Sequence, residues 1–159
     1  MKLSILAVGK VKEKFYCQAI DEFTKRLSRY CKLEIIEVAD EKTPDGAGAA
    51  AESLILKKEG ERLMKYIRDD AHVIALAIEG KMLSSEQFSQ RIEQLGIGGV
   101  SHIQLIIGGS LGLAPEVLRR ADELLSFSKM TFPHQLMRVI LLEQIYRAYR
   151  IMSGAPYHK

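Results

Sequence analysis

The sequence has only two cysteines and no long hydrophobic run, and each of these absences excludes a class of protein. The longest apolar runs, such as residues 73–78 and 103–107, are far shorter than the roughly 20 residues that a membrane span needs. Residues 9–12 (GKVK) end the apolar N-terminal stretch too early for a signal peptide. We therefore expect a cytoplasmic protein. Thiols stay reduced in that compartment, and neither Cys17 nor Cys31 has a histidine at metal-ligand spacing, so we expect neither a disulfide nor a metal site.

Internal repeats and linkers are also absent. Hydrophobic residues make up 47% of the 159 residues and charged residues 27%, as in ordinary folded domains, which excludes global disorder. A chain of this length can bury its own core. Residues 1–159 are therefore expected to form a single domain.

The net charge is only +3, but the charges are unevenly distributed. Residues 1–30 hold seven Lys or Arg against three acids, and residues 129–159 hold five against one. Residues 31–60 run the other way, with four basic and seven acidic residues. Basic ends favour a positive face that suits a phosphate-bearing partner, although ordinary surface charge explains the counts equally well.

Apolar patterning predicts alternating strands and helices. Near-continuous apolar runs indicate buried strands, and apolar residues repeating with a period near 3.6 indicate helices. Residues 43–51, which are small and turn-rich, indicate a loop or a weak helix start. This order is typical of an α/β fold with a parallel sheet. The expected strands are residues 3–8, 33–38, 73–78, 103–107 and 124–127, and the expected helices are 13–29, 53–67, 84–95, 115–121 and 133–152.

The last helix, residues 133–152, is apolar around much of its circumference. Pro133 suits the first turn of a helix, and Gly154 and Pro156 end it. One flank of a small domain does not need so wide an apolar stripe, so we expect this helix to be covered on a second side. A second copy of the chain is the expected cover, because contacts between like subunits are the commonest way to bury such a surface.

Three of the predicted strands run into unusual turns: residues 79–81 (EGK), 108–112 (GGSLG) and 128–132 (SKMTF). The carboxyl ends of parallel strands lie at one edge of a sheet, where ligands bind. The glycine turn lacks the order of a dinucleotide fingerprint, which follows the first strand, and no Gly-Lys-Ser/Thr follows it as a phosphate loop requires. By itself it is either a tight strand-to-helix turn or a place where backbone groups approach a ligand.

Five segments together resemble one family: LAVGK (6–10), EGK (79–81), IGGSLG (107–112), SFSKMTFPHQLMRV (126–139) and PYHK (156–159). They are similar to the ribosomal RNA large subunit methyltransferase H family, a minimal member of the SPOUT class, over essentially the whole chain. The resemblance implies a parallel-sheet fold with a C-terminal trefoil knot, which general topology rules do not predict. It also implies a homodimer packed through the last helix.

The resemblance implies S-adenosylmethionine as the cofactor and methylation at N3 of a pseudouridine in 23S ribosomal RNA, on the assembled ribosome. One departure from the family pattern is Leu111, where a more polar residue is expected after Gly-Gly-Ser, so no polar contact from that side chain is expected. Backbone groups at 108 and 127–132 are expected to read the adenine edge, with Leu76 and Met130 against its faces, although these apolar side chains suit a core equally well. The residues carried over to the cofactor pocket are Leu76, Gly108, Phe127, Ser128, Lys129, Met130, Thr131 and Phe132.

Methyl transfer from a sulfonium requires in-line alignment, and N3 of a pyrimidine must lose its proton. His134, in the first turn of the last helix, is a candidate for contacting the substrate or accepting that proton; packing or capping is the alternative. Arg138, one turn on, is a candidate for holding a phosphate or stabilising the deprotonated base; an exposed charge is the alternative.

Tyr157, His158 and Lys159 end the chain with an aromatic face, a titratable ring and a cation. Such groups hold single-stranded RNA loops, whereas most terminal tails are inert. With the resemblance, they are predicted to bind substrate, with His158 near the chemistry. Further cations are candidates for contacts to the RNA backbone: Lys10, Lys12, Lys14, Arg147 and Arg150.

Two other functions fit the sequence less well. The first is a ribosome-associated RNA-binding protein without enzymatic activity, which would use the same scaffold and the same cations. A flavodoxin-like nucleotide-binding domain is disfavoured by the late position of the glycine turn.

Overall fold

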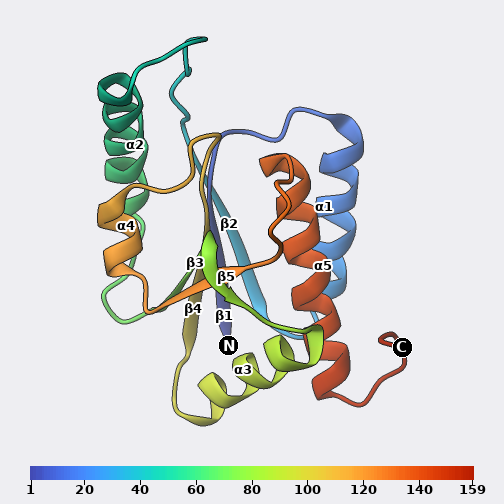
Figure 1. The fold of residues 1–159 in the computed structure, drawn as a ribbon. Helices are drawn as coiled ribbons and strands as arrows, with labels where there is room; N and C mark the ends of the chain where they lie inside the picture. Colours follow the sequence, from blue (N-terminus) through green and yellow to red (C-terminus); the bar gives the residue numbers. More distant parts are fainter.

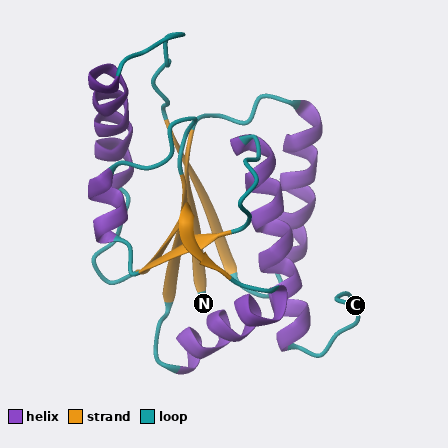
Figure 2. Ribbon diagram, viewed as in Figure 1, coloured by secondary structure: helices purple, strands orange, loops and turns teal.

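A five-stranded sheet, all parallel, separates two layers of helices in a computed structural model that describes residues 1–159 (Figure 1). The strand order is β2-β1-β4-β3-β5. Helices α2 and α4 lie on one face of the sheet, and α1, α3 and α5 lie on the other (Figure 2). The elements in chain order are β1 (Lys2–Val8), α1 (Lys14–Leu27), β2 (Lys32–Val38), α2 (Ala49–Met64), β3 (His72–Met82), α3 (Ser85–Ile97), β4 (His102–Ile107), α4 (Pro115–Arg120), β5 (Glu123–Ser126) and α5 (His134–Met152).

The predicted alternation of strands and helices is confirmed, and most boundaries agree within one or two residues. The third strand was expected to end at residue 78, but β3 runs on to Met82. Its pairing with β5 shifts between Leu76 and Lys81, so four residues bulge out of the sheet and pairing resumes beyond them. Pro133 is the residue before α5 and not its first helical residue, a shift of one position.

The strands are apolar on both sides because both faces of the sheet are covered. On β1, Leu3, Ile5 and Ala7 belong to the core under α1, α3 and α5, whereas Leu6 and Val8 belong to the core under α2 and α4. This two-sided burial is the reason the strand sequences do not alternate between apolar and polar residues.

Helix α5 packs between α1 and α3. Four of its side chains are completely buried: Leu141, Leu142, Ile145 and Ala148. Every other residue of α5 is at least partly buried within the single chain. The helix therefore forms the centre of its layer, with one remaining side turned outward.

Ser84 caps the start of α3. The Ser84 hydroxyl accepts a hydrogen bond from the Gln87 backbone N–H at 3.1 Å, and the Gln87 side chain accepts one from the Ser84 N–H at 2.9 Å. This reciprocal arrangement satisfies two backbone donors that a helix start otherwise leaves free.

Replacing Ser84 with alanine is expected to lower the free energy of unfolding by about 1 kcal/mol, because the cap is lost. Urea unfolding of Ser84→Ala measures the effect. Ser101→Ala is the control, because Ser101 is exposed and its hydroxyl makes no hydrogen bond within the chain. Equal stability of the two variants would contradict the capping role.

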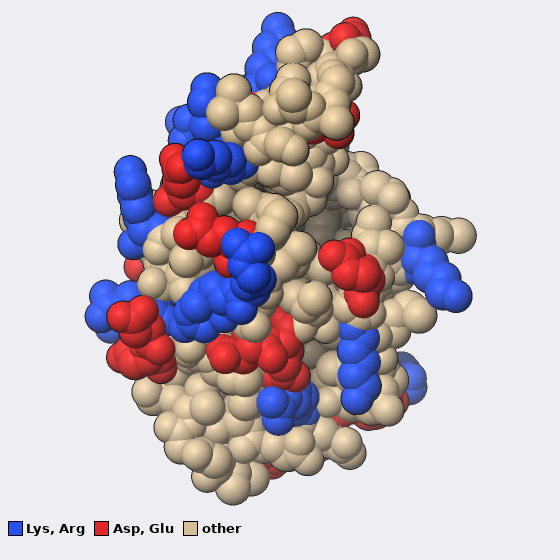
Figure 3. Space-filling view, turned by 60° about the vertical axis from the view of Figure 1, so that its left-hand side comes forward, with Lys and Arg blue, Asp and Glu red and all other residues tan.

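None of the helices combines the length and the apolar character that crossing a bilayer requires. The surface on the α2 and α4 side carries Lys, Arg, Asp and Glu side by side (Figure 3). Several of these charges are paired, such as Lys58 and Arg62 with Glu41 and Arg120 with Asp122. The positive face that the sequence favours is therefore not on this side. The trefoil knot stays a prediction.

Candidate active site

A cavity of about 840 Å³ lies at the carboxyl ends of β3, β4 and β5. Its wall comes mainly from three chain segments, residues 76–79, 107–113 and 125–134. The predicted meeting of three strand-end turns is therefore confirmed, with one correction. Glu79 lines the cavity, but Lys81 does not, because β3 resumes its pairing at Lys81 and carries that side chain away.

The glycine turn brings two stretches of backbone into direct contact. A Cβ on Gly108 would lie within 2.6 Å of the Gly112 carbonyl carbon and would overlap its oxygen. Gly112 has φ of +87°, a conformation that favours glycine. The turn therefore needs glycine at both positions, and it presents main chain to the cavity.

Beneath this turn lies Glu59, a buried carboxyl from α2. Its Oε2 accepts a hydrogen bond from the Glu41 N–H at 2.9 Å, and its Oε1 lies 3.2 Å from where a Cβ of Gly109 would stand. Burial raises the pKa of this carboxyl above its ordinary value. Sequence reasoning missed Glu59, because nothing in a helix at 49–64 indicates that it packs under a turn 50 residues later.

The segment between β5 and α5 forms the opposite wall. The Ser126 hydroxyl donates to the Ser128 carbonyl at 3.2 Å, and the Ser128 hydroxyl accepts from the Met130 N–H at 2.9 Å, so the turn is braced by its own serines. Lys129 is exposed and does not line the cavity. The other residues predicted for the cofactor all line it: Leu76, Gly108, Phe127, Ser128, Met130, Thr131 and Phe132.

Leu111 also lines the cavity, and so do other residues that sequence reasoning did not single out, two of them from helices. Met137 lies one helical turn after His134, so the 3.6-residue period places the two on the same side of α5. Leu118 comes from α4, and no local signal in the sequence connects it to the strand ends.

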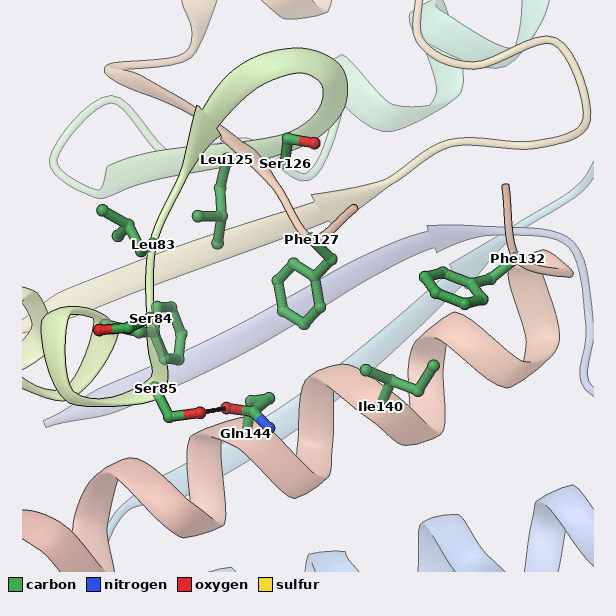
Figure 4. Close-up of a pocket in the computed structure, with 10 residues that line it drawn as sticks. Leu83, Ser84, Ser85, Leu125, Ser126, Phe127, Phe132, Ile140 and Gln144 are labelled. Atoms are coloured by element: carbon green, nitrogen blue, oxygen red, sulfur yellow. Dashed lines mark hydrogen bonds between the residues drawn. The ribbon is translucent and has the colours of Figure 1, made fainter. Parts of the chain in front are cut away.

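A second, smaller cavity of about 250 Å³ adjoins the first and shares Leu125–Phe127 and Phe132 with it. Figure 4 shows this cavity, with Gln144 of α5 beside Ser85 at one end and Ile140 farther along α5, toward Phe132. The Ser85 hydroxyl donates to the Gln144 Oε1 at 2.7 Å and closes that end. The two cavities therefore connect the strand ends to the outward side of α5.

The charge of the large cavity restricts what it can hold. Glu79 and His134 are its only titratable lining residues, and no Lys or Arg contributes to the wall. A phosphate-bearing ligand would find no cation there. Backbone groups, apolar side chains and one carboxylate instead suit a flat heterocycle joined to a positively charged group.

His134 stands where the cavity meets the end of β1. Its Cε1 is 3.5 Å from where a Cβ of Gly9 would lie, and its Nδ1 is buried without a hydrogen-bond partner in the chain. A buried imidazole nitrogen without a partner is uncommon and is a candidate for contacting a ligand.

Arg138 is almost completely buried, with 2% of its side chain exposed. Its guanidinium pairs with Glu37 and donates to the Gly9 carbonyl oxygen at 3.2 Å. It does not line the cavity. Arg138 therefore links α5 to the ends of β1 and β2. The alternative interpretation, that Arg138 is an exposed charge, is wrong.

Arg138→Met is expected to lower the free energy of unfolding by about 2–4 kcal/mol, because it removes a buried ion pair and its hydrogen bond. Chemical denaturation measures the loss, with Arg29→Met as the control, since Arg29 is exposed and makes no ion pair. Unchanged stability together with lost turnover would instead assign the guanidinium to the substrate.

The C-terminal tail lies at the opposite end of α5 from the cavity (Figure 1). The Tyr157 hydroxyl donates to Glu143 at 3.0 Å, and the His158 ring contacts Arg147 and Glu86 at 3.1 and 2.6 Å. Burial raises the pKa of Tyr157, and its bond to Glu143 adds to the shift. The tail therefore packs along the second half of α5, and none of its residues lines either cavity of its own chain.

Comparison with known proteins agrees with this geometry. Residues 1–158 match the family model described as predicted SPOUT methyltransferase. The chain is similar to proteins named ribosomal RNA large subunit methyltransferase H, at 69% identity in Bifidobacterium adolescentis, 63% in Bifidobacterium animalis subsp. lactis and 58% in Clostridium kluyveri. Each of these matches covers 100% of both chains. By this full-length similarity, the chain belongs to the ribosomal RNA large subunit methyltransferase H family of SPOUT methyltransferases.

Proposed function

We propose that this protein transfers the methyl group of S-adenosylmethionine to ribosomal RNA of the large subunit. More specifically, we propose that the atom methylated is N3 of a pseudouridine in 23S ribosomal RNA. The reaction is proposed to take place on the assembled ribosome and hence in the cytoplasm. The observation that carries the proposal is the cavity at the strand ends, with its backbone-rich wall and its lack of cations. A volume near 840 Å³ is within the range of small-molecule sites.

The bound cofactor would supply a methyl group on a sulfonium, which is a good leaving group. The protein's part is then to hold and align the reactants, which can lower a barrier by roughly 7–11 kcal/mol. Backbone groups of Gly108 and of residues 127–132 are proposed to bind the adenine edge. Leu76 and Met130 would hold the faces of the adenine, and the Glu79 carboxylate would favour the cofactor's positive charge.

His134 is proposed to contact the nucleotide. Its unpartnered Nδ1 can accept the proton that N3 of the base must lose, or can hold a hydrogen bond to the base while water removes the proton. Arg138 is proposed to act indirectly: it fixes the carbonyl of Gly9, and the His134 ring lies beside Gly9. In that arrangement it is a positioning residue.

A homodimer through α5 is part of the proposal. Leu136, Val139 and Ile140 are partly buried in the single chain, but they pack against neither core cluster. They form an apolar stripe on the outward side of α5, and Ile140 also borders the small cavity of Figure 4. A second copy of the same stripe is the natural cover for this surface.

Dimerisation also offers a way to bring the tail to the chemistry. A two-fold axis across α5 makes the two helices antiparallel, so that the end of one lies beside the start of the other. The tail of one copy is then proposed to complete the cavity of the other. Tyr157, His158 and Lys159 would bind the RNA there, with His158 a second candidate for proton transfer.

Titration calorimetry with S-adenosylmethionine tests the first step, and saturable binding at one site per chain is expected. Transfer of a labelled methyl group to large ribosomal subunits, compared with naked 23S RNA, tests the second, and greater activity on subunits is expected. Mapping the methylated nucleotide tests the finer proposal. Subunit binding without cofactor binding would support the non-enzymatic RNA-binding alternative and contradict the methyltransferase.

A further inference from the structure

The loop between β1 and α1 is held firmly by its backbone. This loop, with the first turn of α1, comprises residues 10–15, and we call it the basic loop. It begins at the carboxyl end of β1, the same end of the molecule at which α5 starts (Figure 1). Two hydrogen bonds fix its backbone, from Val11 N–H to Glu37 at 3.2 Å and from Lys12 N–H to Gln135 at 3.2 Å. Two more fix Gly9 just before it: its N–H donates to the Val38 carbonyl at 2.8 Å, and its carbonyl accepts from Arg138 at 3.2 Å.

The lysines of the basic loop, by contrast, are free. Lys10, Lys12 and Lys14 are all exposed, and none has a carboxylate within 4 Å, although Glu13 lies between them in sequence and Asp40 lies beside Gly9. The α2 and α4 side is different, because many of its cations are paired with acids (Figure 3). Three unpaired lysines on a fixed backbone form a ready site for phosphates.

An exposed aromatic ring accompanies these lysines. Phe15, in the first turn of α1, is 60% exposed, the highest value for any aromatic residue in the chain, and its ring lies 4.4 Å from that of Tyr16. A lone exposed phenylalanine is ordinary. A phenylalanine beside three free cations is the combination that holds single-stranded nucleic acid, where bases stack on rings and lysines neutralise the backbone.

The basic loop also adjoins the cavity. Gly9, just before it, lies against the His134 ring, and Gln135, the next residue of α5, holds the backbone of Lys12. We propose that the basic loop is an RNA-binding surface that guides an unpaired strand of ribosomal RNA to the cavity, with Phe15 stacking on a base and the three lysines contacting phosphates. This inference rests on the proposed function for the identity of the RNA.

The test uses the full-length protein and purified large ribosomal subunits, with binding and methyl transfer measured separately. The variants are the triple Lys10→Ala/Lys12→Ala/Lys14→Ala, Phe15→Ala and Phe15→Tyr. The matched control is Lys25→Ala/Lys32→Ala/Lys65→Ala, three exposed lysines without ion pairs near the opposite edge of the sheet. Calorimetry with S-adenosylmethionine checks that each variant keeps its cavity.

The triple variant is expected to bind subunits at least tenfold more weakly. The slope of log Kd against log salt concentration is expected to decrease by about two, because each phosphate contact contributes roughly 0.7–0.9 to that slope. Phe15→Ala is expected to weaken binding about tenfold to a hundredfold, and Phe15→Tyr to restore it, since both rings stack. Cofactor affinity is expected to stay unchanged in all variants.

A triple variant that binds like the control variant would overturn the inference. So would loss of binding in Phe15→Ala with no effect of salt or of the lysines, because that pattern indicates a protein partner. If the wild type binds subunits but transfers no methyl group, the proposed function fails while the variants still decide the inference. If the wild type does not bind subunits at all, both fail.

Discussion

Deletion of residues 157–159 is expected to abolish methyl transfer to large ribosomal subunits while leaving the affinity for S-adenosylmethionine nearly unchanged. None of residues 157–159 lines the cavity of its own chain, so their removal leaves the cavity wall intact. What is lost is an aromatic face, an imidazole and a cation for the RNA. Calorimetry and transfer of a labelled methyl group measure the two effects.

Tyr157→Phe is the matched control for this deletion, because it keeps the ring and removes only the hydroxyl bond to Glu143. It is expected to keep most of the activity. The tail also contacts Arg147 and Glu86, so thermal unfolding of the truncated protein must be compared with that of the wild type. Full activity of a folded, truncated protein would remove the tail from the mechanism.

Gly108→Ala is expected to weaken S-adenosylmethionine binding about tenfold to a hundredfold and to reduce turnover at least in proportion. The added Cβ would meet backbone atoms of Gly112, which cannot move away as a flexible side chain can, so the turn must shift. That shift displaces the main-chain groups that are proposed to bind the adenine edge. Calorimetry measures the affinity directly.

Gly48→Ala is the control for this substitution, because a Cβ there meets nothing within 4 Å and the backbone conformation is an ordinary one. It is expected to bind the cofactor normally. If Gly108→Ala bound as tightly as Gly48→Ala, the glycine turn would have no part in the cofactor site.

The two variants together test whether the tail acts on the other copy. A mixture of Gly108→Ala subunits and truncated subunits contains mixed dimers in which an intact cavity faces an intact tail only across the interface. Random mixing is expected to restore about a quarter of the wild-type activity, since half the dimers are mixed and each has one working site. No recovery would mean that the tail serves its own chain or that the chains do not pair.

Much of the fold was predictable because the apolar pattern of a short segment indicates whether it forms a strand or a helix. The continuous apolar runs at β1 and β4 reflect burial on both faces, and the Ser84 cap and the wide apolar stripe of α5 are properties of short segments. The convergence of three strand-end turns was also predictable, because parallel strands end at a common edge. The bulge in β3 was not, since it depends on how β5 pairs with it.

The sequence by itself determined the class of the fold, the family resemblance and most of the residues that line the cavity. Only the tertiary structure decided that Arg138 is buried against Glu37, that Glu59 lies under the glycine turn, that Lys129 is outside the cavity wall and that the tail packs against Glu143. The physical reason is distance along the chain. Local patterning fixes what each segment becomes, whereas burial, pairing and reach depend on contacts between residues as many as 129 positions apart, as for Gly9 and Arg138.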